Sequence, residues 1–414
     1  MRKFVTILLL IVSLALFCGF TQKNDRARVT FTFGSYEIAY QDELLSEPDF
    51  TVTADFHNRR INAPLKDKID CVEQSLVSGA TAKDAMLYTF PKLSQTVDKI
   101  IKAVNCESQN ASITFKPYQN PMFKITREKT GYEVVEESLY YETFLALRKS
   151  QNPTVSIPTL SKLASVKADD LKKCVNLRAR FTTSYENSTE NRKHNIRLAL
   201  SKINGTTIEG GEEFSFNKTV GKRTAQNGYQ DAKIIVGGEY VDGVGGGVCQ
   251  VSTTLYNCAL LADLTVLAVQ PHSLPPTYIP YSLDAMVNSS GSDLRLKNEG
   301  ELPVFIKAYG NDTTATVEIY GTALPYEIKR ESKLISKTAP PPDKIVEDFD
   351  NKYDTADLQA GESKRVSYSS PGISSESYLC YYKKGKLIEK KRLRSDIYRA
   401  KEGVIAVNPS SPSN

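Results

Sequence analysis

The sequence has few histidines and no closely spaced cysteine pair, and these absences exclude several kinds of site. Its 414 residues hold three histidines and seven cysteines, and no C-x-x-C motif occurs among them. Zinc ribbons and dense disulfide scaffolds are therefore excluded. Since there is also no H-x-x-x-H motif, no set of metal ligands is visible, and we expect the protein to need neither a metal nor another cofactor.

The chain also lacks a strong excess of charge of one sign. Lys and Arg number 53 and Asp and Glu number 48, which gives a net charge of +5. So small an excess argues against a dedicated nucleic-acid-binding protein. A glycine run at 243–247 lacks the lysine of the G-x-x-x-x-G-K-S/T phosphate-binding loop, so this run alone predicts no phosphate site.

The first residues favour export of the chain. Arg2 and Lys3 precede an apolar run at 4–20, which is short for a bilayer span of about 20 residues and long for the core of a signal peptide. No Ala-x-Ala cleavage pattern follows, so we expect 1–27 to be an uncleaved membrane anchor and the rest to lie outside the cytoplasm. Because seven cysteines cannot all pair within one chain, the sequence allows a free, reactive thiol there.

A length of 414 residues predicts two to three domains, since domains usually span roughly 100–200 residues. Hydrophobic patterning, turn residues and linker-like segments predict an α+β multidomain fold. The predicted parts are an α+β domain at 28–165, a mixed α/β domain at 176–321, a Pro-rich linker at 322–344, a small all-β domain at 345–407 and a polar tail at 408–414.

Periodicity predicts particular elements. Alternating apolar residues predict strands from Val29 and at 51–56. Apolar residues at three- and four-residue spacing predict a helix over 92–104. Two strands are expected to close around a turn at Gly131, and a helix is expected after Ser188.

Cys249 stands where a glycine run meets a predicted helix, in GVGGGVCQVSTTLYN at 243–257. Glycines let backbone N–H groups point at a ligand oxygen, and a helix N-terminus adds partial positive charge. Both effects favour a thiolate, with a pKa below the value of about 8.5 for an ordinary thiol. Cys249 is therefore a candidate nucleophile, and the alternative is a small buried residue after a glycine turn. Cys258 falls on the apolar stripe of the same helix, so we expect it to pack in the core.

His272 is the candidate general base, because a cysteine nucleophile that needs an imidazole has only three histidines available. It lies in a loop stiffened by flanking prolines, which can hold a base in place. His194 lies in a charged helix start, where we expect a solvated or capping role, and His57 lies in another predicted domain. Asp284 follows in the same loop region and could orient the imidazole, or could simply form a turn.

Several further residues complete the candidate site. Backbone amides just before the cysteine are the candidate oxyanion hole. Arg295 could hold a substrate carboxylate, although on an alternating strand its side chain could also point to water. The candidates are Gly246, Gly247 and Val248 for the oxyanion hole, and Ser252, Tyr278 and Arg295 for substrate binding.

Three stretches together resemble the VanW family: SYENSTENRKHNI, GEEFSFNKTVGKRTAQNGYQDAKIIVGGEYVDGVGGGVCQVSTTLYN and HSLPPTYIP. They occur in order over about 180–310. More loosely, 28–165 resembles the peptidoglycan-binding domain that often precedes a VanW domain. Residues 345–407 resemble the small β module named for its five glycines, for which this chain offers four candidates, Gly361, Gly372, Gly385 and Gly403.

Some VanW-family members are identified as L,D-transpeptidases, and the resemblance implies that activity here. Such an acyltransferase attacks the carbonyl of the third residue of a tetrapeptide stem of peptidoglycan and expels the terminal D-alanine. It then passes the acyl group to the side-chain amine of a neighbouring stem. The family's cysteine matches Cys249 and its histidine matches His272. The implied partners are peptidoglycan stem peptides, and the implied location is the outer face of the cell membrane, facing the cell wall.

Two positions depart from the family pattern, because Asp263 and Ser282 stand where its members commonly carry glycine. These departures bear on the loop around Asp284 rather than on the nucleophile. Two other functions remain open. One is a non-catalytic peptidoglycan-binding protein in which Cys249 is merely packed. The other is a cysteine L,D-carboxypeptidase or peptidase that acts on stem peptides with water as the acceptor.

Overall fold

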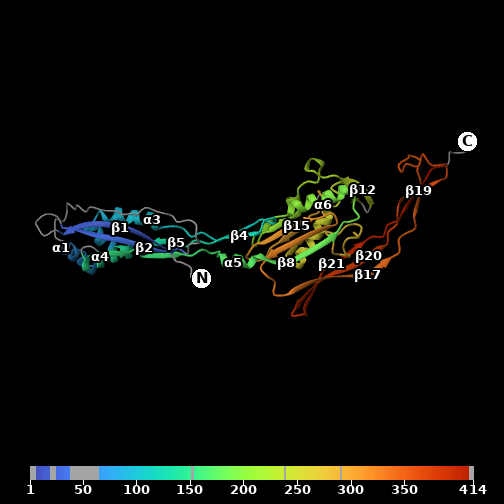
Figure 1. Ribbon diagram of the computed structural model, residues 1–414. Coiled ribbons are helices and arrows are strands. Elements are labelled where there is room, and N and C mark those ends of the chain that lie inside the picture. Colours follow the sequence, from blue (N-terminus) through green and yellow to red (C-terminus); the bar gives the residue numbers. More distant parts are fainter. Residues whose placement is uncertain are drawn as a thin grey trace. The chain divides into compact units, whose positions relative to one another are not determined.

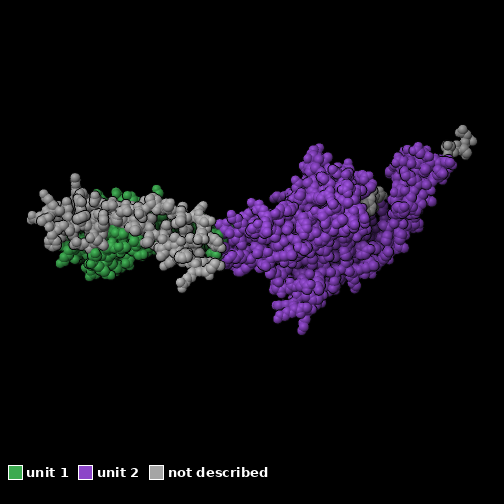
Figure 2. All heavy atoms as spheres, viewed as in Figure 1, with its two compact units in different colours: residues 1–112, 127–167 green, residues 113–126, 168–414 purple. Residues whose placement is uncertain are grey.

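The computed structural model of the chain divides into two compact units, coloured green and purple in Figure 2. Unit 1 comprises residues 1–112 and 127–167, and unit 2 comprises residues 113–126 and 168–414. The structure describes residues 6–18, 25–37, 65–150, 153–236, 239–289 and 291–409.

Unit 1 combines helices with small β-sheets (Figure 1). In its three-stranded sheet, β2 (Asp25–Glu37) is antiparallel to β1 (Thr6–Cys18) and parallel to β6 (Thr154–Ser156). A second sheet pairs β5 (Gly131–Val134) with β7 (Thr159–Lys162). The helices are α1 (Leu65–Val77), α2 (Ala82–Thr89), α3 (Leu93–Val104) and α4 (Glu136–Lys149).

The core of unit 1 confirms the helix predicted at 92–104, which is α3. Val97 and Ile100 on its apolar face are buried together with Phe31 of β2. Thr6–Cys18, from the segment expected as a membrane anchor, is a strand here, and its membrane role stays a prediction. No helix in the described part of the chain is long and apolar enough to cross a bilayer. The strand expected at 51–56 lies outside the described residues, as does His57.

Gly131 marks a close backbone contact and not the expected turn. Tyr132 forms an antiparallel bridge with Cys106, and a Cβ on Gly131 would lie 2.4 Å from the carbonyl oxygen of Cys106. Glycine is needed there because no side chain fits between the two backbones. The expectation of two strands closing around Gly131 was therefore wrong, since β5 pairs with the later strand β7.

The largest sheet around the site in unit 2 supports two helices. Its antiparallel strands follow the order β8 (Asn176–Ser184), β16 (Thr314–Gly321), β15 (Val304–Gly310) and β9 (Thr206–Ile208). The helix expected after Ser188 is α6 (Glu190–Ile203), which Thr189 caps through its side chain. α6 packs on β15, while α8 (Val248–Leu261) packs on β8 and β16 and contacts α6 (Figure 1).

α8 is buried along most of its length, and Cys258 on it is fully buried, as predicted. The helix follows Gly247, whose φ of 105° lies in the left-handed region that suits glycine. Asp263, just past the helix, and Ser282 both have a φ of 58°. These are the two positions where the family commonly carries glycine. The departures therefore change the side chain and keep a backbone conformation that glycine adopts most readily.

A hairpin from the first part of the chain belongs to unit 2. Phe123 on β4 packs against Phe305 and Tyr320 of the large sheet. Residues 113–126 of the expected N-terminal domain thus contribute to the core of the other unit. The hairpin and the smaller elements of this part are β3 (Ser112–Phe115), β4 (Phe123–Thr126), α5 (Ala168–Leu171), β10 (Glu213–Ser215), α7 (Phe216–Val220), β11 (Asp231–Val236), β12 (Glu239–Val244), β13 (Thr265–Ala268) and β14 (Arg295–Lys297), with 3-10 turns at Lys172–Val175 and Ala225–Asn227.

The C-terminal part of unit 2 is built from strands, as predicted. One antiparallel sheet contains β17 (Glu327–Thr338), β20 (Gly372–Lys383) and β21 (Lys386–Tyr398). The other has the order β18 (Lys344–Glu347), β22 (Val404–Val407) and β19 (Ser363–Ser367).

The segment 322–344, expected as a linker, contains the strand β17 and is therefore not a mere spacer. Most side chains of β17 are exposed, and many of them carry a charge or a hydroxyl group. The strand consequently lacks the clear apolar alternation from which a strand is predicted. β17 is instead held in a strand conformation by antiparallel pairing with β20, which runs from Glu327 to Thr338.

Candidate active site

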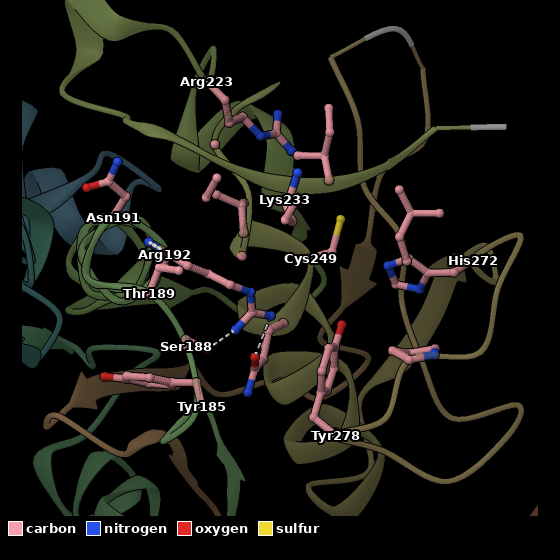
Figure 3. A pocket seen from close by; sticks show the side chains of 18 of the residues that line it. Tyr185, Ser188, Thr189, Asn191, Arg192, Arg223, Lys233, Cys249, His272 and Tyr278 are labelled. Carbon is pink, nitrogen blue, oxygen red and sulfur yellow. Dashed lines mark hydrogen bonds between the residues drawn. The ribbon is translucent and has the colours of Figure 1, made fainter. Parts of the chain in front are cut away.

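A pocket opens beside the N-terminus of α8 (Figure 3). Its cavity volume is about 1530 Å³, and it is lined by the start of α6, the hairpin β11–β12, the glycine turn before α8 and the loop after β13. Cys249, His272 and Tyr278 are among the lining residues. The fold thus brings Cys249 of α8 together with His272 and Tyr278 of the loop after β13.

Cys249 is the second residue of α8, and its side chain is half-buried. Its Sγ–H donates to the carbonyl oxygen of Val287 over 3.2 Å, and the His272 side chain lines the same pocket. Burial alone would raise the pKa of the Cys249 thiol. The hydrogen bond and charge of His272, together with the charge of Arg223, outweigh burial and hold that pKa below its ordinary value. The site therefore favours a thiolate.

His272 lies in the proline-rich loop after β13 and is only 7% exposed. Its Nδ1 lies 2.6 Å from Oδ2 of Asp284, and its backbone N–H donates to the same oxygen over 2.7 Å. The other ring nitrogen, Nε2, is left for Cys249. Burial lowers the pKa of His272, but its hydrogen bonds with Asp284 and Cys249 outweigh burial and raise that pKa to about 9. His194, by contrast, lies on α6 with its Nε2 2.9 Å from the carbonyl oxygen of Gly228, and it does not line the pocket.

Asp284 is fully buried and accepts four hydrogen bonds, so it does more than form a turn. Two come from His272, and the other two come from Arg394 and Tyr398, which donate to Oδ1 over 2.7 Å and 2.8 Å. Burial raises the pKa of the Asp284 carboxyl, but His272 and Arg394 outweigh it and hold the pKa below its usual range. Cys249, His272 and Asp284 thus have the arrangement that a nucleophile, a base and an orienting carboxylate require.

The glycine turn before α8 presents amide groups next to the sulfur. The N–H of Val248 donates to the carbonyl of Gly245 over 3.2 Å, so it belongs to the turn. Among the described residues, no acceptor faces the N–H groups of Gly246, Gly247 and Cys249. A hydrogen bond from the side chain of Asn195 to the carbonyl of Gly246, over 3.0 Å, fixes the turn to α6. The N–H of Val248 is therefore already bonded, whereas those of Gly246, Gly247 and the adjacent Cys249 remain candidates for the predicted oxyanion hole.

The three predicted substrate contacts fall in different places. Tyr278 lines the pocket, and Figure 3 shows its hydroxyl directed toward the side of Cys249. Ser252 is fully buried and donates to the carbonyl of Ala285 over 2.6 Å, so it fixes the loop to α8 and cannot reach a substrate. Arg295 forms an ion pair with Glu213 on the neighbouring strand and does not line the pocket. Ser252 and Arg295 are thus removed from the substrate-binding candidates.

Arg223 is one of the pocket cations that the sequence reasoning missed, and Arg192 and Lys233 also line the pocket. Its guanidinium lines the pocket above Cys249 in Figure 3 and donates to the side chain of Asn217 and the carbonyl of Gly221. A Cβ on Gly245 would lie 2.8 Å from the Cβ of Arg223, so the glycine turn leaves room for this side chain. No spacing in one sequence connects an arginine to a cysteine 26 positions later, because the contact depends on the tertiary fold.

Comparison with known proteins gives the family of this chain. The family model described as "VanW like protein" matches residues 191–320. The "Uncharacterized protein YoaR" of Bacillus subtilis (strain 168) is 32% identical over 232 residues, which cover 55% of this chain and 74% of that protein. The chain belongs to the VanW family. The "Vancomycin B-type resistance protein VanW" of Enterococcus faecalis (strain ATCC 700802 / V583) is 30% identical over 115 residues, which cover 27% of this chain and 42% of that protein.

The matched VanW region contains Cys249, His272 and Asp284, and it ends before Arg394 and Tyr398. Two solved structures match about a fifth of this chain, with low TM-scores. The "Crystal structure of HP0197-G5" has 14% identity and a TM-score of 0.11, covering 20% of this chain and 99% of that one. The "IgA1 Protease G5 domain structure" has 11% identity and a TM-score of 0.14, covering 21% of this chain and 94% of that one.

Proposed function

We propose that this VanW-family protein is a cell-wall L,D-transpeptidase that links the third residues of peptidoglycan stems through a thioester on Cys249. The observation that carries the proposal is the arrangement of a half-buried Cys249 with the buried His272 and Asp284 at the edge of an open pocket. A packed, inert cysteine needs neither an oriented imidazole nor a lowered thiol pKa, whereas a nucleophile needs both.

The first half-reaction forms the thioester. The Cys249 thiolate attacks the carbonyl carbon of the third stem residue, and the amides of Gly247 and Cys249 donate to the oxyanion. Removal of one such donor costs about 2.7–4 kcal/mol in other enzymes. The C–N bond to the terminal D-alanine then breaks, and the His272 imidazolium gives its proton to the departing amine.

The second half-reaction transfers the acyl group. The side-chain amine of a neighbouring stem attacks the thioester carbonyl, and neutral His272 takes a proton from that amine through Nε2. The C–S bond breaks and restores the Cys249 thiolate beside the imidazolium. Asp284 stays ionised throughout and keeps Nδ1 as the donor nitrogen, which leaves Nε2 for the reacting groups.

The pocket fits a peptide substrate better than a small molecule. Its volume of about 1530 Å³ exceeds the roughly 300–1,000 Å³ of common small-molecule sites, so it has room for a donor and an acceptor stem. Arg223 supplies a positive charge beside Cys249, where the carboxylate of the departing D-alanine would lie. Stem peptides are thus the proposed partners, and no nucleic acid is expected.

The names of the relatives support a role in the cell wall, since one of them is a vancomycin resistance protein. We further propose that residues 1–27 anchor the chain at the outer face of the membrane. In this view unit 1 binds peptidoglycan, in keeping with the resemblance of 28–165. The strand-rich C-terminal part would also face the cell wall.

Mass spectrometry of the full-length protein with purified disaccharide-tetrapeptides tests the proposal. We expect an acyl adduct on Cys249, release of D-alanine, and dimers linked between third residues, all of which are lost in Cys249→Ala. Cys106→Ala is the matched control, because it removes an exposed free thiol of unit 1 and should leave every product unchanged. Tripeptide stems without dimers would instead indicate a carboxypeptidase. Unchanged tetrapeptides, with a control enzyme active in the same sample, would indicate a non-catalytic binding protein.

A further inference from the structure

The carboxylate of Asp284 is held by two separate parts of unit 2. Its Oδ2 accepts from His272, within the stretch that matches the VanW family model. Its Oδ1 accepts from Arg394 and Tyr398 on β21, and the family match ends at residue 320. Half of the hydrogen bonds to the orienting carboxylate therefore come from the C-terminal sheet.

Arg394 is buried among partners that fix its guanidinium. Its side chain is 13% exposed, and its Nε lies 2.7 Å from Oδ2 of Asp396. The guanidinium carbon lies 5.8 Å from the ring centre of Tyr256, which belongs to α8. The cation thus contacts both the aspartate of the site and the helix that carries the nucleophile. The guanidinium is thus hydrogen-bonded to Asp284 through Nη2 and paired by charge with Asp396.

Tyr398 connects the same carboxylate to the backbone of its loop. Its hydroxyl donates to Oδ1 of Asp284 over 2.8 Å and accepts from the N–H of Ser282 over 3.1 Å. The hydroxyl of Ser282 lies 2.7 Å from that of Ser375 on β20. Ser282 stands where the family commonly carries glycine, and a glycine has no hydroxyl for this second bond. The loop of Asp284 is therefore bound to both β20 and β21.

We propose that Arg394 and Tyr398 are positioning residues of the active site, so that the C-terminal sheet sets the orientation of His272 through Asp284. The inference deepens the proposed function and rests on it only for the identity of the reaction. Loss of either partner leaves one oxygen of a buried carboxylate short of a donor, which lets the carboxylate turn and releases the imidazole. The charged and titratable groups around this arrangement are Cys249, His272, Arg223, Tyr256, Tyr278, Arg394, Asp396 and Tyr398.

The test measures alkylation of Cys249 by iodoacetamide as a function of pH in the full-length protein, with the modified peptide identified by mass spectrometry. This reaction needs no substrate, so it gives an answer whether or not the protein is a transpeptidase. We expect Arg394→Met to slow alkylation at neutral pH about tenfold, at the lower end of the effects of such supporting residues. Its pH midpoint should move toward that of an ordinary thiol. Arg394→Lys should restore part of the rate, because it keeps the positive charge.

Arg392→Met is the matched control, since Arg392 lies on the same strand but is 62% exposed and pairs with Glu376. It should leave the pH profile unchanged. Tyr398→Phe keeps the buried ring and removes only the hydroxyl, so it keeps the test decisive if Arg394→Met does not fold. The proposal is overturned if Arg394→Met and Tyr398→Phe both keep the wild-type profile, or if Arg392→Met shifts it equally.

A second measurement links the effect to catalysis. If the full-length protein cross-links stem peptides, Tyr398→Phe should lower kcat and leave KM unchanged, because the hydroxyl does not line the pocket. A rise in KM with unchanged kcat would mean that Tyr398 shapes substrate binding, and the positioning role would be rejected. Absence of any cross-linking by the wild type, together with the expected alkylation profiles, would overturn the proposed function and leave this inference standing.

Discussion

Replacement of Asp284 by asparagine tests the core of the proposed site. In the wild type, Oδ1 accepts from Arg394 and Tyr398, and Oδ2 accepts from His272. An asparagine that keeps its oxygen toward Arg394 and Tyr398 turns its NH₂ group toward the imidazole. Nδ1 of His272 must then accept a hydrogen bond, which places the ring proton on Nε2 and prevents that nitrogen from taking a proton.

The size of the effect follows from the pKa of His272. Its surroundings raise this pKa from 6.5 to about 9. At about 1.4 kcal/mol per pKa unit, the folded site favours the protonated ring by about 3 kcal/mol. Because the asparagine variant loses the contribution of Asp284 to this preference, and because Nε2 already carries the ring proton, we expect cross-linking by Asp284→Asn to fall roughly 100-fold.

The assay compares initial rates of dimer formation from disaccharide-tetrapeptides for the wild type, Asp284→Asn and Asp312→Asn. Asp312 is 91% exposed and pairs only with Arg197 at the surface, so its amide variant controls for the loss of one negative charge. Thermal melting checks that each variant is folded. A folded Asp284→Asn protein with the wild-type rate would refute the role of Asp284 as the orienting carboxylate.

Three further predictions concern the thiol, the turn and the hairpin. Because the pKa of Cys249 is lowered, alkylation of Cys249 should persist below the pH at which the thiol of a free cysteine-containing peptide in the same sample stops reacting. A midpoint for Cys249 at or above that of the peptide would contradict the lowered pKa. Gly247→Ala puts a residue with a side chain at a φ of 105°, and its Cβ would lie 3.0 Å from the Cγ of Arg192. We therefore expect the free energy of unfolding in urea titrations to fall by about 1–3 kcal/mol. Phe123→Ala should lower the free energy of unfolding by about 1–3 kcal/mol in the same measurement, because its partly buried ring packs on the core of unit 2, and an unchanged midpoint would exclude that packing.

The sequence predicted the local features of this protein better than its long-range contacts. Periodic apolar residues gave α3, because one face of that helix is buried and the other is not. The scarcity of histidine pointed to His272, and the glycine run before a helix pointed to Cys249. Both arguments use residues close together in the chain or rare in it.

Other features left no local pattern. β17 is mostly exposed and half of its residues are charged, so its order comes from pairing with β20 and cannot be seen in its own residues. Gly131 resembled a turn because glycine serves both turns and close backbone contacts. Arg223 and Arg394 reach the site only through the tertiary fold, and Arg394 lies 110 positions after the aspartate that it contacts.

Asp284 and its partners on β21 are far apart in the sequence, and this separation sets the order in which the site is assembled during synthesis. A chain grows from its N-terminus, so Cys249, His272 and Asp284 are all made before Arg394 and Tyr398. Until β21 pairs with β20, Asp284 has only His272 as a donor. A chain that is still being made would therefore carry its cysteine without the finished arrangement around it. Full reactivity of the thiol would be reached only after the C-terminal sheet has folded and Arg394 and Tyr398 have reached Asp284.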